Sequence, residues 1–411
     1  MKNALFIAYD FPPSSSSTGQ LRTLAFCRHL PDFGWQPAVL TATANAYPRI
    51  DRSSLAAIPD ATEVARAFAF DAKKVMGLRG NYPVWVAQPD RWWSWWFAGV
   101  IRGLAAIRRH KPQVIWSTYP ITTAHLIGLT LHRLTGLPWI ADFRDPVGTS
   151  VLKSPLTDRT RAWVERATVA HCARGVFTTR GAAELYRQRF PEKTDATWQV
   201  IPNGYDEGDF SDLADAAPPA ASGRPVKLLH SGVLYREHRD PQAFFVALAK
   251  LKAEGLVRAD NLVVVLRASG NEAHYDSVIR SMGIEDIVRL EPAIPYREAL
   301  AEQMGADGLL LWQGERYNRQ IPAKVYEYFR TGRPMLALVE PGGDTANLVD
   351  DMIDGAYAPM NDADRIREQL MQFLTSIRSG CDKYKISPDK VSGFSRRGGA
   401  RQLAEIFNTL A

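Results

Sequence analysis

Residues 321–339, IPAKVYEYFRTGRPMLALV, contain a short helix pattern followed at once by an apolar strand pattern. Pro322 suits the first position of the helix, and Gly332 suits its end. Lys324 then falls in the first turn, where the helix dipole and the free N–H groups already carry positive charge. A phosphate bound at this end of the helix would remove that electrostatic penalty. The segment therefore predicts an anion site at a helix N-terminus.

The spacing of the polar residues predicts how this helix is used. Lys324, Glu327 and Tyr328 share one face at intervals of three and four residues, whereas Val325 and Phe329 form an opposite pair that faces a core. The polar face would offer a cation for phosphate and a carboxylate for hydroxyl groups. A surface helix with an incidental Lys324–Glu327 pair fits this segment equally well.

The same alternation of helix and strand patterns extends along the whole chain, which is typical of parallel α/β units. Strands are expected at 4–9, 38–41, 114–117, 139–142, 176–179 and 198–201, and then at 227–230, 262–266, 287–290, 308–312 and 335–339. A segment rich in Asp, Ala and Pro separates the two series.

We therefore predict an α/β protein with two Rossmann-like, doubly wound domains that face each other across a cleft. The domains are expected at 1–205 and 227–390, with a linker at 206–226. Residues 391–411 are expected to form a C-terminal helix that closes the fold and packs back on the first domain. Ligands bind at the carboxyl ends of the strands in such sheets, so polar residues there are the candidates for function.

Composition limits the classes of function. The 411 residues carry a formal net charge of +6, which suits phosphorylated ligands or an anionic membrane but is too weak to imply nucleic acid. The three cysteines, Cys27, Cys172 and Cys381, lack metal-ligand spacing, so neither a disulfide framework nor a zinc site is expected. No apolar run is long enough for a signal peptide core or a membrane span. These features predict a cytoplasmic protein.

In the first domain, two loops at strand ends carry candidate residues. The loop at 10–22, DFPPSSSSTGQLR, has small residues that let a ligand approach the backbone, but it lacks the dinucleotide fingerprint and the P-loop lysine. A flexible surface loop is the alternative. Residues 141–146, ADFRDP, place two carboxylates around a guanidinium, which suits activation of a hydroxyl nucleophile or stabilisation of charge. A structural Asp–Arg pair is the alternative.

In the second domain, His230, Ser231 and Gly232 end the first strand, and Arg236 and Arg239 follow within a few residues. A glycine beside two arginines is what a diphosphate requires. A solvated charged loop is the alternative. The D-x-D triplet at 362–364 lies at a helix start, where an N-cap role is favoured over metal binding, so no metal site is predicted.

In combination, these segments resemble the bacterial glycosyltransferases of family 4, which have the GT-B fold. The resemblance covers nearly the whole chain, and the order and spacing of its motifs are specific in combination. It rests on FPP at 11–13 with Gly19 and Arg22, ADFRDP at 141–146, IPNG at 201–204, HSG at 230–232, and IPAKVYEY at 321–328 through GRP at 332–334.

The resemblance implies transfer of a sugar from a UDP-, GDP- or dTDP-linked donor, with retention of configuration and without a bound metal or other cofactor. The donor would lie mainly on the second domain, with Glu327 on its ribose and Lys324 and Arg239 on its diphosphate. The implied site comprises Asp142, Arg144 and Asp145 for catalysis; Gly19, Gly232, Arg236, Arg239 and Lys324 for the diphosphate; Glu327, Pro292, Ala293 and Ile294 for the nucleotide; and Arg22, Asn203, Gly204, His230, Ser231, Gln320, Ile321 and Tyr328 as further cleft candidates.

Two positions depart from the family pattern. Many members have two glutamates separated by seven residues, but Arg319 stands where the first would be, so Gln320 or backbone N–H groups would have to hold the sugar. Arg144 stands where a histidine is often found. The transferred sugar and the catalytic assignment therefore stay open.

Residues 91–109 are a candidate membrane surface. At helical spacing Arg91, Trp95, Arg102 and Arg109 share a face, and a basic amphipathic helix with tryptophans suits a membrane interface. A core helix whose tryptophans pack inside the domain is at least as well supported. A surface of this kind would place the enzyme peripherally on the cytoplasmic face of the inner membrane, near a lipid-linked acceptor.

The sequence thus predicts a glycosyltransferase that acts on a glycan, glycolipid or small-molecule acceptor in cell-surface polysaccharide synthesis. A nucleotide-sugar epimerase of the GT-B fold is one alternative. A GT-B protein that binds a glycan or nucleotide without turnover is another, because fold alone does not establish catalysis.

Overall fold

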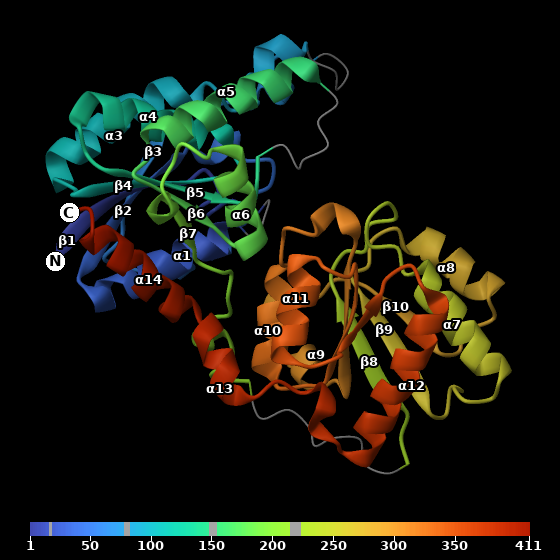
Figure 1. The fold of residues 1–411 in the computed structure, drawn as a ribbon. Helices are drawn as coiled ribbons and strands as arrows, with labels where there is room; N and C mark the ends of the chain where they lie inside the picture. The colour runs from blue at the N-terminus through green and yellow to red at the C-terminus, as the bar shows by residue number, and fades with distance from the viewer. Residues whose placement is uncertain (16–18, 78–82, 148–153, 214–222) are drawn as a thin grey trace. The chain divides into compact units, whose positions relative to one another are not determined.

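The computed structural model describes residues 1–15, 19–77, 83–147, 154–213 and 223–411 (Figure 1). The chain forms two compact units. Unit 1 comprises Met1–Asn203 and Arg396–Ala411, and unit 2 comprises Gly204–Ser395. The last segment of the chain thus belongs to the unit that contains the N-terminus.

Unit 1 is built on a seven-stranded sheet in the order β3-β2-β1-β4-β5-β6-β7, with every pair parallel. Its strands are β1 Lys2–Ile7, β2 Trp35–Ala42, β3 Glu63–Ala67, β4 Val114–Thr118, β5 Trp139–Arg144, β6 Arg174–Phe177 and β7 Trp198–Val200. Its helices are α1 Gly19–His29, α2 Ala72–Val75, α3 Trp95–His110, α4 Thr122–Thr135, α5 Pro155–His171, α6 Arg180–Arg189 and α14 Arg396–Asn408. The strand order reverses between β1 and β4, where doubly wound sheets bind their ligands.

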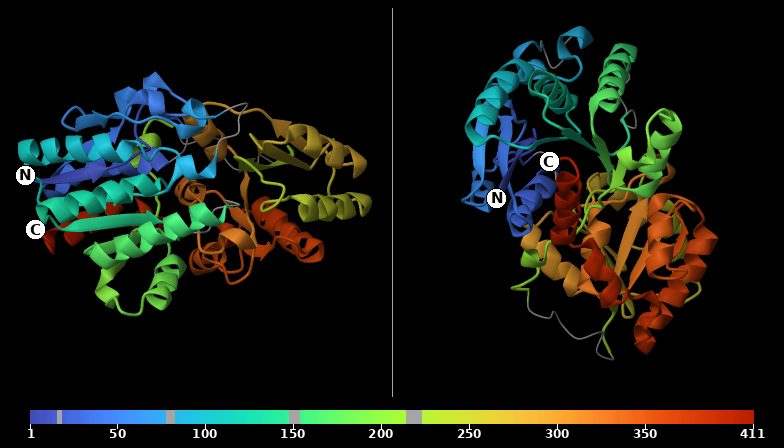
Figure 2. Two further views of the ribbon diagram at one scale, coloured as in Figure 1. Left: turned by 90° about the horizontal axis from the view of Figure 1, so that it is seen from above. Right: turned by 60° about the vertical axis from the view of Figure 1, so that its left-hand side comes forward.

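Alternate residues of the central strand β1 enter two different cores, because side chains of a strand alternate between the faces of its sheet. Leu5 and Ile7 join the core of one face, and Phe6 joins the core of the other. Helix α14 covers the second face together with α1 (Figure 2). The ring of its Phe407 lies 6.3 Å from that of Phe6. The C-terminal helix is therefore a structural part of unit 1.

On the first face, helices α3 and α4 pack closely because glycines line their contact. A Cβ atom at Gly99 would lie 2.6 Å from Ile127 Cδ1, and one at Gly103 would lie 2.5 Å from Leu131 Cδ1. Both distances are far below a van der Waals contact, so a side chain at either position would force Ile127 or Leu131 of α4 to move.

Unit 2 repeats the architecture with a six-stranded parallel sheet in the order β10-β9-β8-β11-β12-β13. Its strands are β8 Val226–Ser231, β9 Leu262–Arg267, β10 Val288–Glu291, β11 Gly308–Gln313, β12 Met335–Val339 and β13 Tyr357–Pro359. Its helices are α7 Gln242–Ala253, α8 Glu272–Ser281, α9 Tyr296–Met304, α10 Ala323–Thr331, α11 Asp344–Met352, α12 Ala363–Ser379 and α13 Pro388–Val391. Its order reverses between β8 and β11, so the carboxyl ends of these two strands flank the expected ligand position.

These two sheets confirm the predicted fold class of two Rossmann-like domains. Every expected strand is present within a few residues of its predicted bounds, but β3 and β13 were not predicted. Both lie at an edge of their sheet, β3 with two charged residues and β13 with only three residues in all, so neither shows a buried apolar run. In the described part of the chain, no helix is both long and apolar enough to cross a membrane.

Candidate functional site

Lys324 lies in the first turn of α10, as predicted, although Pro322 occupies the N-cap and not the first helical position. Its ammonium group donates to the Ser231 carbonyl at 2.6 Å and approaches His230 Nε2 at 3.5 Å. Burial and the nearby charge of Arg239 lower the pKa of Lys324 to about 7, and the carboxylate of Glu327 offsets part of this shift. The lysine is therefore a desolvated cation that an anion would stabilise.

The end of β8 is shaped to receive this lysine. Gly232 has a φ of +117°, and a Cβ atom there would lie 2.6 Å from Lys324 Nζ. His230 is fully buried, and its Nδ1 bonds to the Leu310 carbonyl at 2.8 Å, so Nδ1 carries the proton and Nε2 accepts from Lys324. Burial, followed by the charge of Lys324, lowers the pKa of His230 well below its usual value and keeps the ring neutral.

Arg239 supplies a second cation at the same place. Its Nε donates to Gln313 Oε1 at 3.0 Å, and its guanidinium stacks near the rings of Tyr235 and Tyr317 at 5.5 and 5.3 Å. Burial lowers the pKa of Arg239. In the part of unit 2 that the structure describes, neither Arg239 nor Lys324 forms an ion pair with a carboxylate. Two adjacent cations therefore have only neutral hydrogen-bond partners.

Glu327 and Tyr328 lie on α10 but are more buried than a polar surface face would be. Glu327 is 8% exposed, and its Oε1 accepts from the Tyr296 hydroxyl at 2.8 Å. Tyr328 is fully buried in the core of unit 2, and its hydroxyl accepts from the Ser231 N–H at 3.0 Å. Tyr328 and Lys324 share a face of α10, as predicted, because both bond to Ser231 at the end of β8, but the ring of Tyr328 is buried in the core.

The segment 292–294 follows β10 and leads into α9. Pro292 and Ala293 are exposed and Ile294 is half-buried. Arg267, the last residue of β9, donates to the Pro292 carbonyl at 2.9 Å and forms a two-bond pair with Glu302 at 2.8 and 2.9 Å. A fixed arginine thus anchors the start of the predicted base-binding loop.

The remaining predicted residues of unit 2 are less closely associated with Lys324. Arg236 is exposed on the turn after β8. The backbone carbonyl of Gln320 accepts from Gln313 Nε2 at 3.2 Å and from Thr345 Oγ1 at 2.9 Å. These contacts of Gln320 are therefore made by its backbone and not by its side chain. Ile321 packs against the core.

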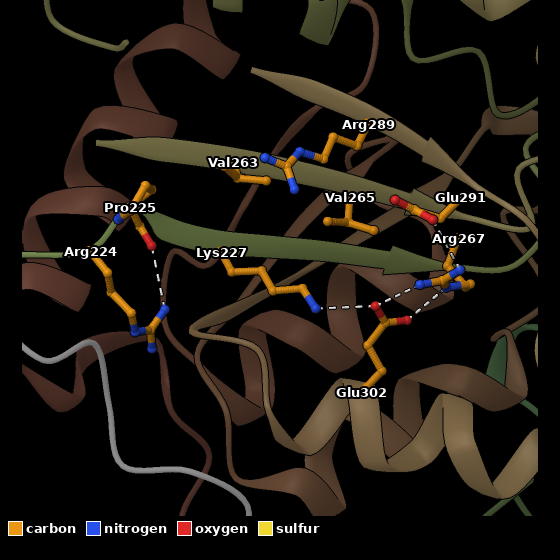
Figure 3. Close-up of a pocket in the computed structure, with 9 residues that line it drawn as sticks. All are labelled: Arg224, Pro225, Lys227, Val263, Val265, Arg267, Arg289, Glu291 and Glu302. Atoms are coloured by element: carbon orange, nitrogen blue, oxygen red, sulfur yellow. Dashed lines mark hydrogen bonds and ion pairs between the residues drawn. The ribbon is translucent and has the colours of Figure 1, made fainter. Parts of the chain in front are cut away.

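An open pocket of about 450 Å³ lies on the face of β8, β9 and β10 (Figure 3). Val263 and Val265 form part of its lining, and charged side chains surround them. Lys227 pairs with Glu302 at 3.1 Å, and Arg224 pairs with Asp307 outside the pocket lining at 2.7 Å. Because most of its cations are already paired, the pocket does not offer the uncompensated positive charge found at Lys324.

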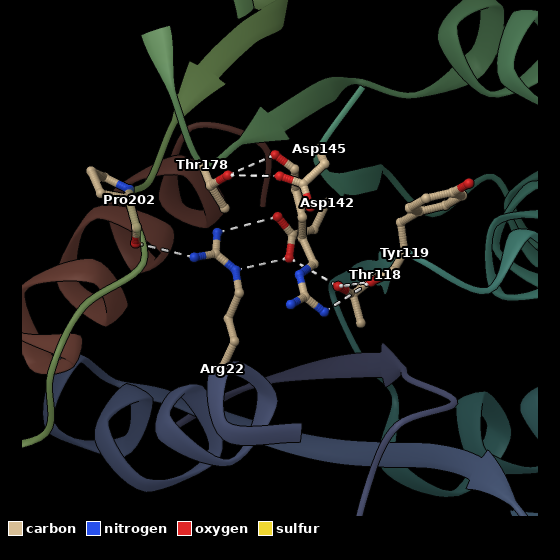
Figure 4. A network of polar contacts seen from close by, with 8 residues as sticks. Arg22, Thr118, Tyr119, Asp142, Asp145, Thr178 and Pro202 are labelled. Atoms are coloured by element: carbon tan, nitrogen blue, oxygen red, sulfur yellow. Dashed lines mark hydrogen bonds and ion pairs between the residues drawn. The ribbon is translucent and has the colours of Figure 1, made fainter. Parts of the chain in front are cut away.

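In unit 1, Asp142 is bound on both oxygens (Figure 4). Arg22 donates through Nε to Oδ2 at 3.0 Å and through Nη2 to Oδ1 at 3.2 Å, and Thr118 donates to Oδ2 at 3.0 Å. Asp142 is fully buried and Arg22 is 8% exposed. Arg22 also donates to the Pro202 carbonyl at 3.2 Å. This network joins α1, β4, β5 and the segment after β7, and it occupies a carboxylate that we had predicted for catalysis.

Arg144 and Asp145 lie beside this network with a different environment. Arg144 has a φ of +61° at a shift of register between β5 and β6, and its Nη1 donates to the Tyr119 carbonyl at 3.2 Å. A left-handed arginine costs conformational energy, and such residues are enriched at functional sites. Burial raises the pKa of Asp145, which the charge of Arg144 and the hydroxyl of Thr178 partly offset. Asp145 is thus the carboxyl group of this cluster best suited to exchange a proton.

The other predicted residues of unit 1 lie at the same edge of the sheet. Gly19 is the buried first residue of α1, and Asn203 and Gly204 follow Pro202 at the end of unit 1 and the start of unit 2. Residues 16–18 of the predicted loop lie outside the described residues. Among the described residues, no group of three or more His, Cys, Asp or Glu side chains could hold a metal ion. Asp362 caps α12 by accepting from Asp364 N and Arg365 N, which confirms its N-cap role.

Residues 91–109 differ from the predicted arrangement in one respect. Trp95 is fully buried and does not lie on the basic face, while Trp92, Trp93 and Trp96 each donate a hydrogen bond within unit 1. The tryptophans therefore pack as in a core helix. Phe97, at 56% exposure, and Ile101, at 70%, are the large apolar residues that α3 leaves open to solvent.

Four polar residues of these clusters were not predicted, namely Thr118, Thr178, Tyr296 and Gln313. Thr118 and Gln313 end β4 and β11, the strands next to the two reversal points. A polar residue at the end of an apolar run was therefore a usable signal for them. No comparable signal marked Tyr296, whose role depends on the contact between α9 and α10.

Comparison with known proteins shows what the first domain is similar to and supports the fold of the whole chain. Residues 18–204 match the family model of a glycosyl transferase 4-like domain. No curated protein sequence matches.

Solved structures resemble the whole chain at low identity. Sucrose-phosphate synthase from Thermosynechococcus elongatus is 13% identical, with a TM-score of 0.70 over 100% of this chain and 99% of that chain. HepE from Anabaena in complex with UDP is 13% identical, with a TM-score of 0.66 over 100% of both chains. A putative UDP-N-acetylglucosamine 2-epimerase from Listeria monocytogenes is 11% identical, with a TM-score of 0.61 over 100% of this chain and 96% of that chain. The protein therefore has, in its two Rossmann-like units, the GT-B fold, and its residues 18–204 are similar to the glycosyl transferase 4-like domain.

Proposed function

We propose that this protein is a glycosyltransferase that moves a sugar from a nucleotide-sugar donor to a glycan, glycolipid or small-molecule acceptor, with retention of configuration. The observation that carries the proposal is the pair of cations at the carboxyl edge of the second sheet. Lys324 and Arg239 are both half-buried with neutral hydrogen-bond partners, and Lys324 lies at a helix N-terminus. A diphosphate is the ligand class that would satisfy both cations and the N–H groups of the helix.

The chemistry of glycosyl transfer explains why such cations would matter. Breaking the bond between a sugar and a diphosphate develops negative charge on the leaving group, so cations already in place stabilise the transition state more than the ground state. In the proposal, Lys324 and Arg239 supply this charge without a metal ion, and Glu327 accepts the ribose hydroxyls. Asp145 and Arg144 act on the transferred sugar and acceptor, while Asp142 positions Arg22.

The fold supports a nucleotide-sugar donor by analogy. HepE has been solved with UDP and with UDP-glucose, and its likeness to this chain extends over 100% of both chains. The epimerase alternative shares the fold as well. The two classes differ in their products, because an epimerase converts its nucleotide sugar without an acceptor.

Thermal-shift titration with UDP-, GDP- and dTDP-linked sugars tests the donor assignment. We expect at least one nucleotide class to raise the melting temperature of the wild type and to lose this effect in Lys324→Met and Glu327→Gln. Proton NMR of the stabilising sugar, with and without candidate acceptors, then separates transfer from epimerisation. Stabilisation by none of the nucleotide sugars would refute the proposal.

We further propose that the acceptor is lipid-linked and that α3 contacts an anionic membrane. Phe97 and Ile101 are exposed on α3, and Arg102, Arg108 and Arg109 on the same helix are exposed as well. Apolar insertion combined with basic side chains is the mode of interfacial helices. Sedimentation with vesicles containing phosphatidylglycerol should recover the wild type but not a Phe97→Ser, Ile101→Ser variant. Equal recovery of both would contradict this part of the proposal.

A further inference from the structure

Tyr296 connects the predicted base-binding loop with the predicted ribose-binding carboxylate. It is the first residue of α9 and follows the loop 292–295 directly. Its side chain is 40% exposed, yet its hydroxyl donates to Glu327 Oε1 at 2.8 Å. Helices α9 and α10 lie in contact (Figure 1). The bond between Tyr296 and Glu327 therefore joins two elements of unit 2.

The hydroxyl has a second acceptor in range but a clear preference. Asp209 Oδ2 lies 3.5 Å away, and a phenol has one proton to donate. The bond to Glu327 is shorter by 0.7 Å, which follows from the two distances, and it is directed at the more buried carboxylate. Glu327 is therefore the acceptor that matters for the position of the phenol.

The surroundings hold both helices in place. Arg297, the next residue of α9, donates to Asp212 Oδ2 at 2.9 Å. Arg330, one turn after Glu327 on α10, pairs with Glu207 at 2.8 Å. The start of α9 and the end of α10 are thus both bound to the segment 207–212, and the Tyr296–Glu327 bond connects the two helices directly.

We propose that Tyr296 is a positioning residue of the nucleotide site: its phenol fixes the Glu327 carboxylate so that it accepts the ribose hydroxyls, and this sets the preference for ribose over 2′-deoxyribose. The inference rests on the proposed function. The bond from Tyr296 occupies one of the about four lone-pair sites of the carboxylate. This bond restricts the rotation of the Glu327 carboxylate, so that its remaining bonding directions point at a particular ribose hydroxyl. A site built around a hydroxyl discriminates strongly against an analogue that lacks it.

The test compares UDP with 2′-deoxy-UDP, and GDP with 2′-deoxy-GDP, by calorimetric titration. The wild type should bind the ribonucleotide of the accepted pair about 10- to 100-fold more tightly, as expected for a hydrogen bond to a charged group. Tyr296→Phe keeps the ring and removes the hydroxyl. It should reduce this ratio of affinities to below about threefold, mainly by weakening the binding of the ribonucleotide. Tyr357→Phe on β13, at the opposite edge of the sheet, is the matched control and should keep the wild-type ratio.

A double-mutant cycle identifies the route of the effect. In a Glu327→Gln background, which already lowers the ratio, Tyr296→Phe should have little further effect because both changes act on the same bond. An unchanged ratio in Tyr296→Phe, or effects that add in the double variant, would overturn the inference and leave the proposed function standing. Failure of the wild type to bind any of these four nucleotides or dTDP would overturn both, whereas binding of dTDP alone would overturn only the inference.

Discussion

Each sheet carries a charged cluster at its own carboxyl edge, but the charges are neutralised in one cluster and not in the other. In unit 1, Arg22 and Asp142 neutralise each other through two hydrogen bonds inside the protein. In unit 2, Lys324 and Arg239 lie together with a carbonyl, an imidazole and an amide as partners. The first cluster is complete without a ligand, whereas the second gains most from one.

This difference separates a structural role from a binding role for residues that look alike in sequence. A buried ion pair whose partners are both present contributes to holding its elements together, and removing one partner leaves an uncompensated charge. A desolvated cation without a carboxylate beside it has a lowered pKa, as Lys324 does, and binding of an anion reverses that shift. Substitutions in the two units should therefore affect different measurements.

The largest expected effect is on stability, from Asp142→Asn. This change removes the charge that neutralises buried Arg22 and should lower the free energy of unfolding of unit 1 by about 3 to 5 kcal/mol. Every tryptophan except Trp312 lies in unit 1, so denaturation followed by tryptophan fluorescence reports on this unit.

Asp32→Asn is the matched control, because it breaks the exposed pair between Asp32 and Arg397 in the same unit. Its effect should stay below about 1 kcal/mol. Equal stability of the two variants would show that the Arg22–Asp142 pair is not the structural centre described above. Binding of nucleotide, which we propose for unit 2, should be unchanged in both.

The next largest effect is on affinity, from Lys324→Met. Loss of a charge-assisted bond to the diphosphate should weaken binding of the accepted nucleotide by about 1.5 to 3 kcal/mol, measured by titration calorimetry. Unfolding of unit 2 should be no easier than in the wild type at pH 7, since the variant removes a desolvated cation.

Lys250→Met provides the control for this variant. Lys250 is exposed on α7 and pairs with Asp364, so its loss should leave nucleotide affinity unaltered. If Lys324→Met bound nucleotide as tightly as Lys250→Met, the contrast between the two units would lose its functional meaning.

A smaller effect is expected from pH. Without ligand, Lys324 has a pKa of about 7, and an anion beside it would raise that pKa. Binding should therefore take up a proton above pH 7, and affinity should fall as pH rises, by up to about tenfold per unit. UDP-glucose is the suitable ligand, because its diphosphate does not titrate in this range.

Two further results are expected if Lys324 causes this dependence of affinity on pH. Lys324→Met should show affinity that is flat between pH 7 and 9. In the absence of nucleotide, the stability of wild-type unit 2 should rise with pH above about 7, since the unfolded lysine, with its usual pKa of 10.5, still binds the proton that the folded one has lost. A wild-type affinity that is independent of pH would contradict the lowered pKa.

The sequence was sufficient for the fold because apolar runs of strand length recur through both halves of the chain. Strand β12 was predicted at its observed bounds, Met335–Val339, and the reversal points then follow from doubly wound topology. The edge strands β3 and β13 were missed because an edge strand needs fewer buried residues. Helix α10 was predicted from its caps, yet the burial of Tyr328 depends on the core of unit 2 and has no local signal.

The sites were harder to predict because partners come from distant segments. Asp142 and Arg22 are 120 residues apart, and only the folded sheet shows that each satisfies the other. The tryptophans of 91–109 fitted either a membrane surface or a core helix. In the structure, α3 packs closely on α4 through its glycines, as in a core helix. Charge type was readable from sequence, whereas the presence or absence of a neutralising partner was not.

The smallest effect should come from Arg267→Met. This variant tests whether a cation of unit 2 that is already paired with a carboxylate has a structural role, as Arg22 has in unit 1. Arg267 is 13% exposed and bound to Glu302, but it also donates to the Pro292 carbonyl at the start of the base loop. Its loss should loosen this loop and weaken nucleotide binding by about 1 kcal/mol, the value of one ordinary hydrogen bond. The effect should be lost for a ligand without a base, so inorganic diphosphate should bind the variant and the wild type equally. A matching loss of diphosphate affinity would instead place Arg267 with Lys324 and Arg239 among the cations that bind the anion directly.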